Sequence, residues 1–190
     1  MIATGLLLAF LLTAAVTDLW RQKIYNWTTY PGILIGLGLN VVGAIVEMVR
    51  EPDDRLRRLV GWIGLQESVA GLFACGLIML ICLAFFRIGG GDVKLVAMLG
   101  AFLGLEQGIE AVLWTFVFGG CVGLIVLVWR VGVIKLLVQS FRRVAAALRF
   151  GGWLPLTDEE RSHLKSRLFL APMAAAAVIV VRFSLLDLLP

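Results

Sequence analysis

The chain has 190 residues, of which 61% are hydrophobic and only 16% charged, and its mean hydropathy is +0.97. A soluble globular domain is about half apolar and about a quarter charged, so this composition argues against a soluble protein and indicates a polytopic membrane protein. The formal net charge of +4 is less informative than the side of the membrane on which the charges lie. The length suits one helical bundle, so residues 1–190 are predicted to form a single membrane-embedded domain.

Six apolar segments follow one another along the chain, and each is predicted to cross the membrane as a helix. They cover residues of about 2–19, 27–49, 66–86, 93–105, 109–129 and 168–188. The predicted fold class is therefore all-α, a polytopic bundle of six transmembrane helices. The first segment lacks the basic start of a signal peptide and is expected to be retained. The fourth is short for a span, which requires a thinned bilayer or extension by its flanks.

Two of the connecting segments combine charged and apolar residues. Between the second and third apolar segments, "REPDDRLRRLVGWIGLQES" mixes charged and apolar residues, which predicts a helix lying along the membrane surface. The fifth connection, residues 131–167, is the longest polar region, and "VGVIKLLVQSFRRVAAALRF" in it has apolar residues at helical spacing and four basic ones. It is predicted to be a cytoplasmic basic loop with an amphipathic helix on the anionic inner leaflet, or else a contact for substrate or partner.

The distribution of basic residues predicts the orientation. Of the 17 Lys and Arg residues, 12 lie in the connections after the first, third and fifth segments. By the positive-inside rule these connections are cytoplasmic and both termini lie outside. Asp18, at the end of the first segment, and Asp92, at the start of the fourth, then lie on the same cytoplasmic side.

Each of these two aspartates also has a purely structural interpretation. Asp18 is explained as a helix end that is solvated at the interface or paired with Arg21 or Lys23. Asp92 is explained as the N-cap of the helix that follows it, since an anion suits a helix N-terminus. Ionisable residues at membrane depth are costly, however, and usually carry function or have a partner.

A pair of carboxylates on one side of the membrane suggests acid–base chemistry. When two carboxyl groups share a proton, the two apparent pKa values of the pair move apart. The ionised group can then take a proton from water while the protonated group donates to a carbonyl oxygen. The glycines of "IGGGDVKL", Gly89 and Gly91 among them, leave room beside Asp92 for a backbone or a substrate. Lys94 either tunes Asp92 or faces the interface, and the sequence leaves both open.

Metal chemistry and cofactors find no support in the sequence. Cys75, Cys82 and Cys121 lie inside apolar runs without the spacing of a thiolate pair, and the one histidine, His163, lies in a charged loop. These cysteines are interpreted as small core residues. No metal site, no cofactor and no nucleic-acid partner is predicted.

The motifs resemble those of a known family, the type IV prepilin peptidases, which are intramembrane aspartic proteases. Gly89-Gly90-Gly91-Asp92-Val93-Lys94-Leu95 resembles their GxGDVKL sequence. Asp18 is followed by Arg21, Lys23 and Ile24-Tyr25-Asn26, which is similar to the spacing after the family's other aspartate. The stretch "LFLAPMAAAAV" resembles the proline-containing start of the family's last span. The resemblance covers nearly the whole chain and implies that Asp18 and Asp92 are catalytic, with Gly89, Gly91, Lys94 and Asn26 supporting the site or the approach of substrate.

Three departures from the family pattern stand out. Tyr25 occupies the position of a usual proline, which loosens the expected turn. The N-terminal segment with paired cysteines, found in members that also methylate the mature pilin, is not seen, so the chain resembles the short form, similar to the peptidases of Flp/tight-adherence pili or of archaeal-type preflagellins. The fifth connection is longer and more basic than the core of the fold needs.

The resemblance implies an endopeptidase that cleaves the short basic leader from a prepilin, pseudopilin or preflagellin precursor. The expected location is the cytoplasmic (inner) membrane, with the active site facing the cytoplasm and membrane lipids as neighbours. A presenilin-like protease, a proton-coupled transporter and an inactive assembly protein of the same fold are the alternatives. The particular substrate, its cleavage site, the acid–base assignment of the two aspartates and the oligomeric state stay open.

Overall fold

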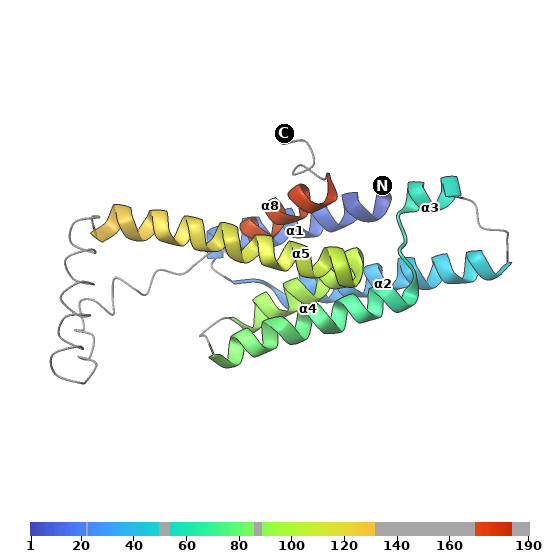
Figure 1. The fold of residues 1–190 in the computed structure, drawn as a ribbon, viewed down its shortest axis with the longest axis horizontal. Coiled ribbons are helices and arrows are strands. Elements are labelled where there is room, and N and C mark those ends of the chain that lie inside the picture. Colours follow the sequence, from blue (N-terminus) through green and yellow to red (C-terminus); the bar gives the residue numbers. More distant parts are fainter. Residues whose placement is uncertain (22, 50–53, 86–88, 132–169, 184–190) are drawn as a thin grey trace. The chain divides into compact units, whose positions relative to one another are not determined.

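The protein is all-helical over the residues that a computed structural model describes, which are 1–21, 23–49, 54–85, 89–131 and 170–183 (Figure 1). No strand occurs in these ranges, so the all-α prediction is confirmed for them. The helices are α1 (Ile2–Arg21), α2 (Asn26–Val49), α3 (Asp54–Val60), α4 (Leu65–Phe85), α5 (Gly90–Val131) and α8 (Leu170–Arg182). Residues 1–117 and 169–190 form one compact unit and residues 118–168 another, of which 118–131 continue α5. All that follows concerns the first unit.

The described helices include four, among them α1, α2 and α5, that are long and apolar enough to cross a membrane. The protein is therefore a multi-pass membrane protein, as predicted. The predicted number of six spans is not established, because α8 has 13 residues, fewer than the ~20 that a full span needs. A short helix, α3, occurs where a surface helix was predicted, and its relation to the membrane stays a prediction. The predicted basic loop, residues 131–167, lies outside the described residues except for the last residue of α5, and His163 lies outside them entirely.

The helix α5 consists of two arms that meet at Gly104. Its φ of 82° and ψ of −169° are not helical, and glycine adopts such a positive φ without the steric cost that a side chain adds. A Cβ built on Gly108 would lie 3.3 Å from the Cα of Gly100. Residues eight apart in a straight helix are separated by about 12 Å, so the chain turns back on itself at Gly104. The predicted segments 93–105 and 109–129 correspond to the two arms.

The ends of the helices meet in two groups. Asp18 near the end of α1, Asn26 at the start of α2, Asp92 in the first turn of α5 and Ala171 in the first turn of α8 lie at what we call the aspartate end. The start of α1, the end of α8, α3 and the Gly104 turn lie at the far end, where Met1 donates to the Arg58 carbonyl. The first arm of α5 therefore runs from the aspartate end to the far end.

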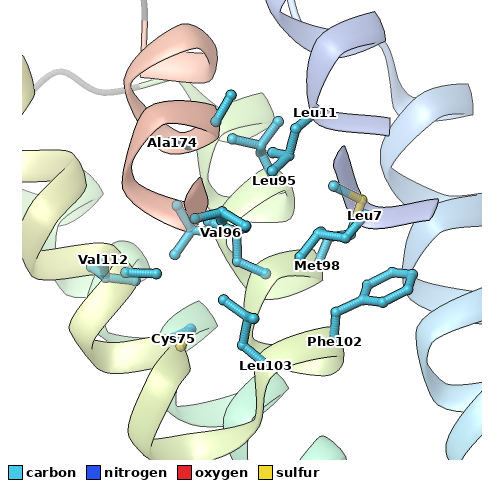
Figure 2. Packing of buried hydrophobic residues seen from close by; sticks show 14 of the residues in the cluster. Leu7, Leu11, Cys75, Leu95, Val96, Met98, Phe102, Leu103, Val112 and Ala174 are labelled. Atoms are coloured by element: carbon cyan, nitrogen blue, oxygen red, sulfur yellow. The ribbon is translucent and has the colours of Figure 1, made fainter. Parts of the chain in front are cut away.

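The core packs side chains of α1, both arms of α5 near its turn, α4 and α8 (Figure 2). α1 contributes residues spaced three or four apart, which is the spacing of one helix face, and the first arm of α5 contributes a longer run. The fully buried members include Leu7, Leu11, Cys75, Leu95, Val96, Met98, Leu99, Val112 and Ala174. The inner face of α2 differs, because glycines recur on it and larger side chains fill the space: Met98 lies against Gly32 and Phe102 against Gly36.

The backbones of α4 and the first arm of α5 approach each other closely. A Cβ built on Gly71 would collide with the backbone carbonyls of Gly100 and Gly104, and Ser68 Oγ donates to the Ala101 carbonyl at 2.6 Å. Small residues at such crossings let backbones approach closely, which is how helices pack in membranes. This contact holds the arm that carries Asp92 against α4.

We expect Gly71→Ala to destabilise the bundle by about 1–3 kcal/mol or more, because the added methyl group has no space between two backbones. The unfolding midpoint of the purified protein in detergent measures this effect. Gly76→Ala on the same helix is the matched control, since its Cβ would only come within 3.4 Å of the Ala97 methyl group. Equal midpoints for the two variants would contradict the close crossing.

Candidate active site

Asp18 is a buried carboxylate at the end of an apolar helix face. Leu7, Leu11 and Ala14 precede it at helical spacing on the inner side of α1, and Asp18 itself is only 8% exposed. Because these residues share one face, the same periodicity that buries the leucines directs Asp18 inwards. The interpretation of Asp18 as a solvated helix end is therefore wrong.

The hydrogen-bond partner of Asp18 comes from the other end of the chain. The backbone N–H of Ala171 donates to Asp18 Oδ2 at 3.4 Å. Ala171 lies in the first turn of α8, where N–H groups lack an acceptor within the helix. The contact thus satisfies a buried donor and a buried carboxylate together, and it places the start of α8 beside Asp18.

Asp92 is fixed by the glycine that begins its own motif. Gly89 donates its N–H to Asp92 Oδ2 at 3.2 Å, and the N–H of Asp92 donates to the Gly89 carbonyl at 3.0 Å. A Cβ on Gly89 would lie 3.2 Å from Asp92 Oδ2, so glycine gives the carboxylate its space. The carboxylate closes a turn at the start of α5, but the interpretation of Asp92 as the N-cap is wrong, because Asp92 lies inside the first turn of α5 and accepts from the N–H of the residue before the helix. This contact does not exclude a second role.

The two carboxylates lie at the same end of the bundle, where Ile24 of the connection after Asp18 lies against Gly91. Asp18 and Asp92 interact electrostatically through space, although one lies in α1 and the other in α5. Each of them accepts a backbone N–H through Oδ2, from α8 in one case and from Gly89 in the other. That this end of the bundle faces the cytoplasm stays a prediction.

Gly91 is the glycine that touches the connection between α1 and α2. A Cβ on Gly91 would lie 3.0 Å from Ile24 Cβ and 3.2 Å from the Ile24 carbonyl oxygen. A Cβ on Gly90 would have no neighbour within 4 Å. Gly91 thus lets the segment after Asp18 lie directly against the segment before Asp92.

Lys94 and Asn26, both named from the sequence, contact each other. Lys94 Nζ donates to Asn26 Oδ1 at 2.8 Å and lies 4.7 Å from the centroid of the Tyr30 ring. Asn26 and Tyr30 are one turn apart on α2, so the ammonium group joins the first turn of α2 to the first turn of α5. Of the two roles left open for Lys94, neither is decided by these contacts, which show only that its ammonium group is directed towards α2.

Sequence reasoning gave no part in the site to Ala171, Ile24 or Tyr30, although Ile24 and Ala171 lie in stretches that resemble the family's motifs. The proline after Ala171 signals a helix start, but a backbone N–H carries no side-chain signature, and its partner lies 153 residues away. Within the described ranges, no group of three His, Cys, Asp or Glu residues is arranged to hold a metal ion.

Comparison with known proteins adds one match. Residues 5–124 match the family model described as the type IV leader peptidase family. The matched stretch contains both aspartates, the three glycines, Lys94 and Asn26. No curated protein and no solved structure gives a match.

Proposed function

The chain belongs to the type IV leader peptidase family, and from this premise we propose that it is an aspartic endopeptidase with Asp18 and Asp92 as its catalytic pair. Its substrates are prepilin-like precursors, namely prepilins, pseudopilins or preflagellins. The enzyme cleaves the peptide bond between the short basic leader and the apolar segment that follows.

The observation that carries this proposal is that two aspartates from separate helices lie at one end of the bundle, where the connection after Asp18 packs against Gly91, the residue before Asp92. In the proposed reaction, the ionised carboxylate takes a proton from a water molecule as the water oxygen attacks the carbonyl carbon. The protonated carboxyl group donates to the carbonyl oxygen and gives a tetrahedral intermediate. When the C–N bond breaks, the carboxyl group that took the proton from water gives it to the leaving nitrogen. One hydroxyl group of the tetrahedral intermediate gives its proton to the other carboxylate as the new carbonyl forms, so the pair again holds one proton.

The position of the pair suits a substrate that is partly outside the membrane. Two large aromatic side chains follow Asp18 closely in sequence and are exposed, Trp20 by 86% and Trp27 by 80%. Exposed tryptophans gather where a membrane protein crosses the lipid–water interface. This supports a site near the interface, and the excess of basic residues in the adjoining connections favours the cytoplasmic face of the inner membrane.

The alternatives fit these observations less well. A proton-coupled transporter needs carboxylates near the membrane midplane, whereas Asp18 lies near the end of α1 and Asp92 in the first turn of α5. An inactive relative that only kept the fold has no need for two carboxyl groups at one end of the bundle.

Co-expression with candidate prepilins from the same genome tests the proposed function. Leader removal is read as a shift in size, and mass spectrometry of the product identifies the cleaved bond. We expect processing of at least one candidate by the wild type. A well-folded protein that processes none of them contradicts the proposal, and proton flux in proteoliposomes then tests the transporter.

We expect Lys94→Met to lower the rate of leader removal about fivefold, because the contact that joins the starts of α2 and α5 is lost. The double-mutant cycle of Lys94→Met with Asn26→Leu should show a coupling of about 1 kcal/mol in activation free energy. Lys23→Met removes the same charge from the same end of the bundle and serves as the control. Additive effects of the two substitutions on the activation free energy would show that the contact between Lys94 and Asn26 does not contribute. An equal loss of rate with Lys23→Met would show that the positive charge matters and not this contact.

A further inference from the structure

The helix α8 is held to α1 at both of its ends. At the aspartate end the Ala171 N–H contacts Asp18, and at the far end Arg182 Nε donates to Thr4 Oγ1 at 2.9 Å. The two helices therefore run antiparallel, as Figure 1 also shows. Between these contacts they pack through small buried side chains, which allow close approach. On α8 these are Ala171, Ala174, Ala175 and Ala177, and on α1 they are Ala14 and Ala15.

The two contacts are consistent with one register between the helices. From Thr4 to Asp18 α1 rises by about 21 Å, and from Ala171 to Arg182 α8 rises by about 16 Å, at 1.5 Å per residue. The long side chain of Arg182 spans the difference between these two distances. A helical slip by one residue in either direction would separate the Ala171 N–H from Asp18 or Arg182 from Thr4.

Arg182 also holds a second helix. Its Nη1 donates to Gln107 Oε1 at 3.1 Å, just beyond the Gly104 turn of α5. Arginine presents several donors on one rigid plane, and a single lysine nitrogen does not reproduce this geometry. The far end of α8 is therefore fixed to α1 and α5, which are the helices that carry Asp18 and Asp92.

At the aspartate end, the backbone N–H of Ala171 is available to donate to a group outside α8. Its N–H lies in the first turn of α8 without an acceptor in the helix, and Pro172 after it has no N–H at all. Ala171 is completely buried, so bulk water does not compete for its N–H. Asp18 Oδ2 is the acceptor that meets it.

We propose that α8 is the positioning element for Asp18, in which the Ala171 N–H orients the carboxylate and Arg182 sets the helix register that brings this N–H there. The role rests on the proposed function, because it matters only if Asp18 reacts. With Oδ2 held, rotation of the carboxylate is restricted, so its orientation towards Asp92 is set before substrate arrives. Neither Ala171 nor Arg182 touches the reacting atoms, and both are positioning residues.

The decisive variant replaces Ala171 by lactic acid during cell-free synthesis, which changes the backbone amide to an ester and removes the N–H alone. We expect kcat to fall about tenfold with KM unchanged, since a hydrogen bond to a charged group is lost and no substrate contact is. We also expect the shape of the pH–rate profile to change, because the environment of one member of a coupled pair is altered. A loss of folded enzyme lowers the rate at every pH and leaves the shape as it was.

The matched control places the same ester at Ala174, one turn further along α8 and equally buried. There the lost N–H belongs to the helix and not to Asp18, so kcat and the pH–rate profile of the folded enzyme should stay as in the wild type. An equal fall in kcat for both esters, or wild-type kinetics with the Ala171 ester, would overturn the proposal.

A second variant tests the same role from the far end. Arg182→Met should lower kcat severalfold at unchanged KM, and Arg182→Lys should restore only part of it. Arg57→Met is the control, because Arg57 lies at the far end but pairs with Glu47 of α2 at 3.9 Å instead of holding α8. Full activity of Arg182→Met would overturn the part assigned to Arg182. Absence of cleavage by the wild type would refute the proposed function itself, whereas cleavage that ignores both α8 variants refutes only the positioning role.

Discussion

Asp92→Asn and Asp18→Asn are each expected to lower the rate of leader removal by about 10²–10⁴-fold, which is the usual contribution of a general acid or base. Asparagine keeps an oxygen that can accept the N–H of Gly89 or Ala171, so the local structure is retained. It does not exchange a proton with water or with a carbonyl oxygen at neutral pH. The initial rate with purified enzyme and a prepilin substrate measures the effect.

The double variant distinguishes a catalytic pair from two aspartates that contribute to the rate independently. Residues that act as a unit are strongly non-additive, so Asp18→Asn/Asp92→Asn should be about as slow as the slower single variant. Glu110→Gln is the control, because it neutralises an exposed carboxylate elsewhere on α5. Wild-type turnover by either single aspartate variant would refute the assignment of the pair.

Gly91→Val is expected to lower kcat by about 100-fold, a loss typical of reacting groups displaced by about 1 Å. The Cβ of any side chain at this position would lie 3.0 Å from Ile24 Cβ and 3.2 Å from the Ile24 carbonyl oxygen. Valine therefore forces the segment after Asp18 away from the segment before Asp92. Steady-state kinetics of the purified variant measure the loss.

Gly90→Val is the matched control for Gly91→Val. It introduces the same β-branched residue one position earlier, where a Cβ would have no neighbour within 4 Å. Both variants carry the same helix-propensity cost at the start of α5, so the difference between them reports on the contact with Ile24. Equal activities would mean that close approach at Gly91 is not needed.

The sequence predicted those parts of the fold that depend on long apolar runs and on side-chain motifs. The predicted segments 27–49 and 66–86 differ by one residue at most from the ends of α2 and α4. Asn26 begins α2 although Tyr25 stands where the family has proline, because the Tyr25 carbonyl accepts the N–H groups of Thr28 and Thr29. The length of the apolar run and the hydrogen bonds of the first turn are therefore sufficient to form α2 without that proline.

The parts that the sequence did not predict depend on the backbone. The sequence predicted a break between the two arms of α5, but it did not place the turn at Gly104, because the chain has 21 glycines and their spacing does not single out this one. The donor to Asp18 is a backbone N–H, which nearly every residue type supplies. Its assignment requires the register of α8 against α1, and that register follows from a contact of Arg182 at the opposite end.

The contact between Ala171 and Asp18 joins residues separated by 153 positions, and this has a consequence for biogenesis. At roughly 5–20 residues per second, a ribosome needs about 8–30 s to reach Ala171 after it has made Asp18. During that interval α1 presents a carboxylate whose partner from α8 has not been synthesised. The insertion machinery or bound water must meet the cost of that carboxylate until α8 arrives, so Asp18 and Asp92 reach their final arrangement only after α8 has been synthesised.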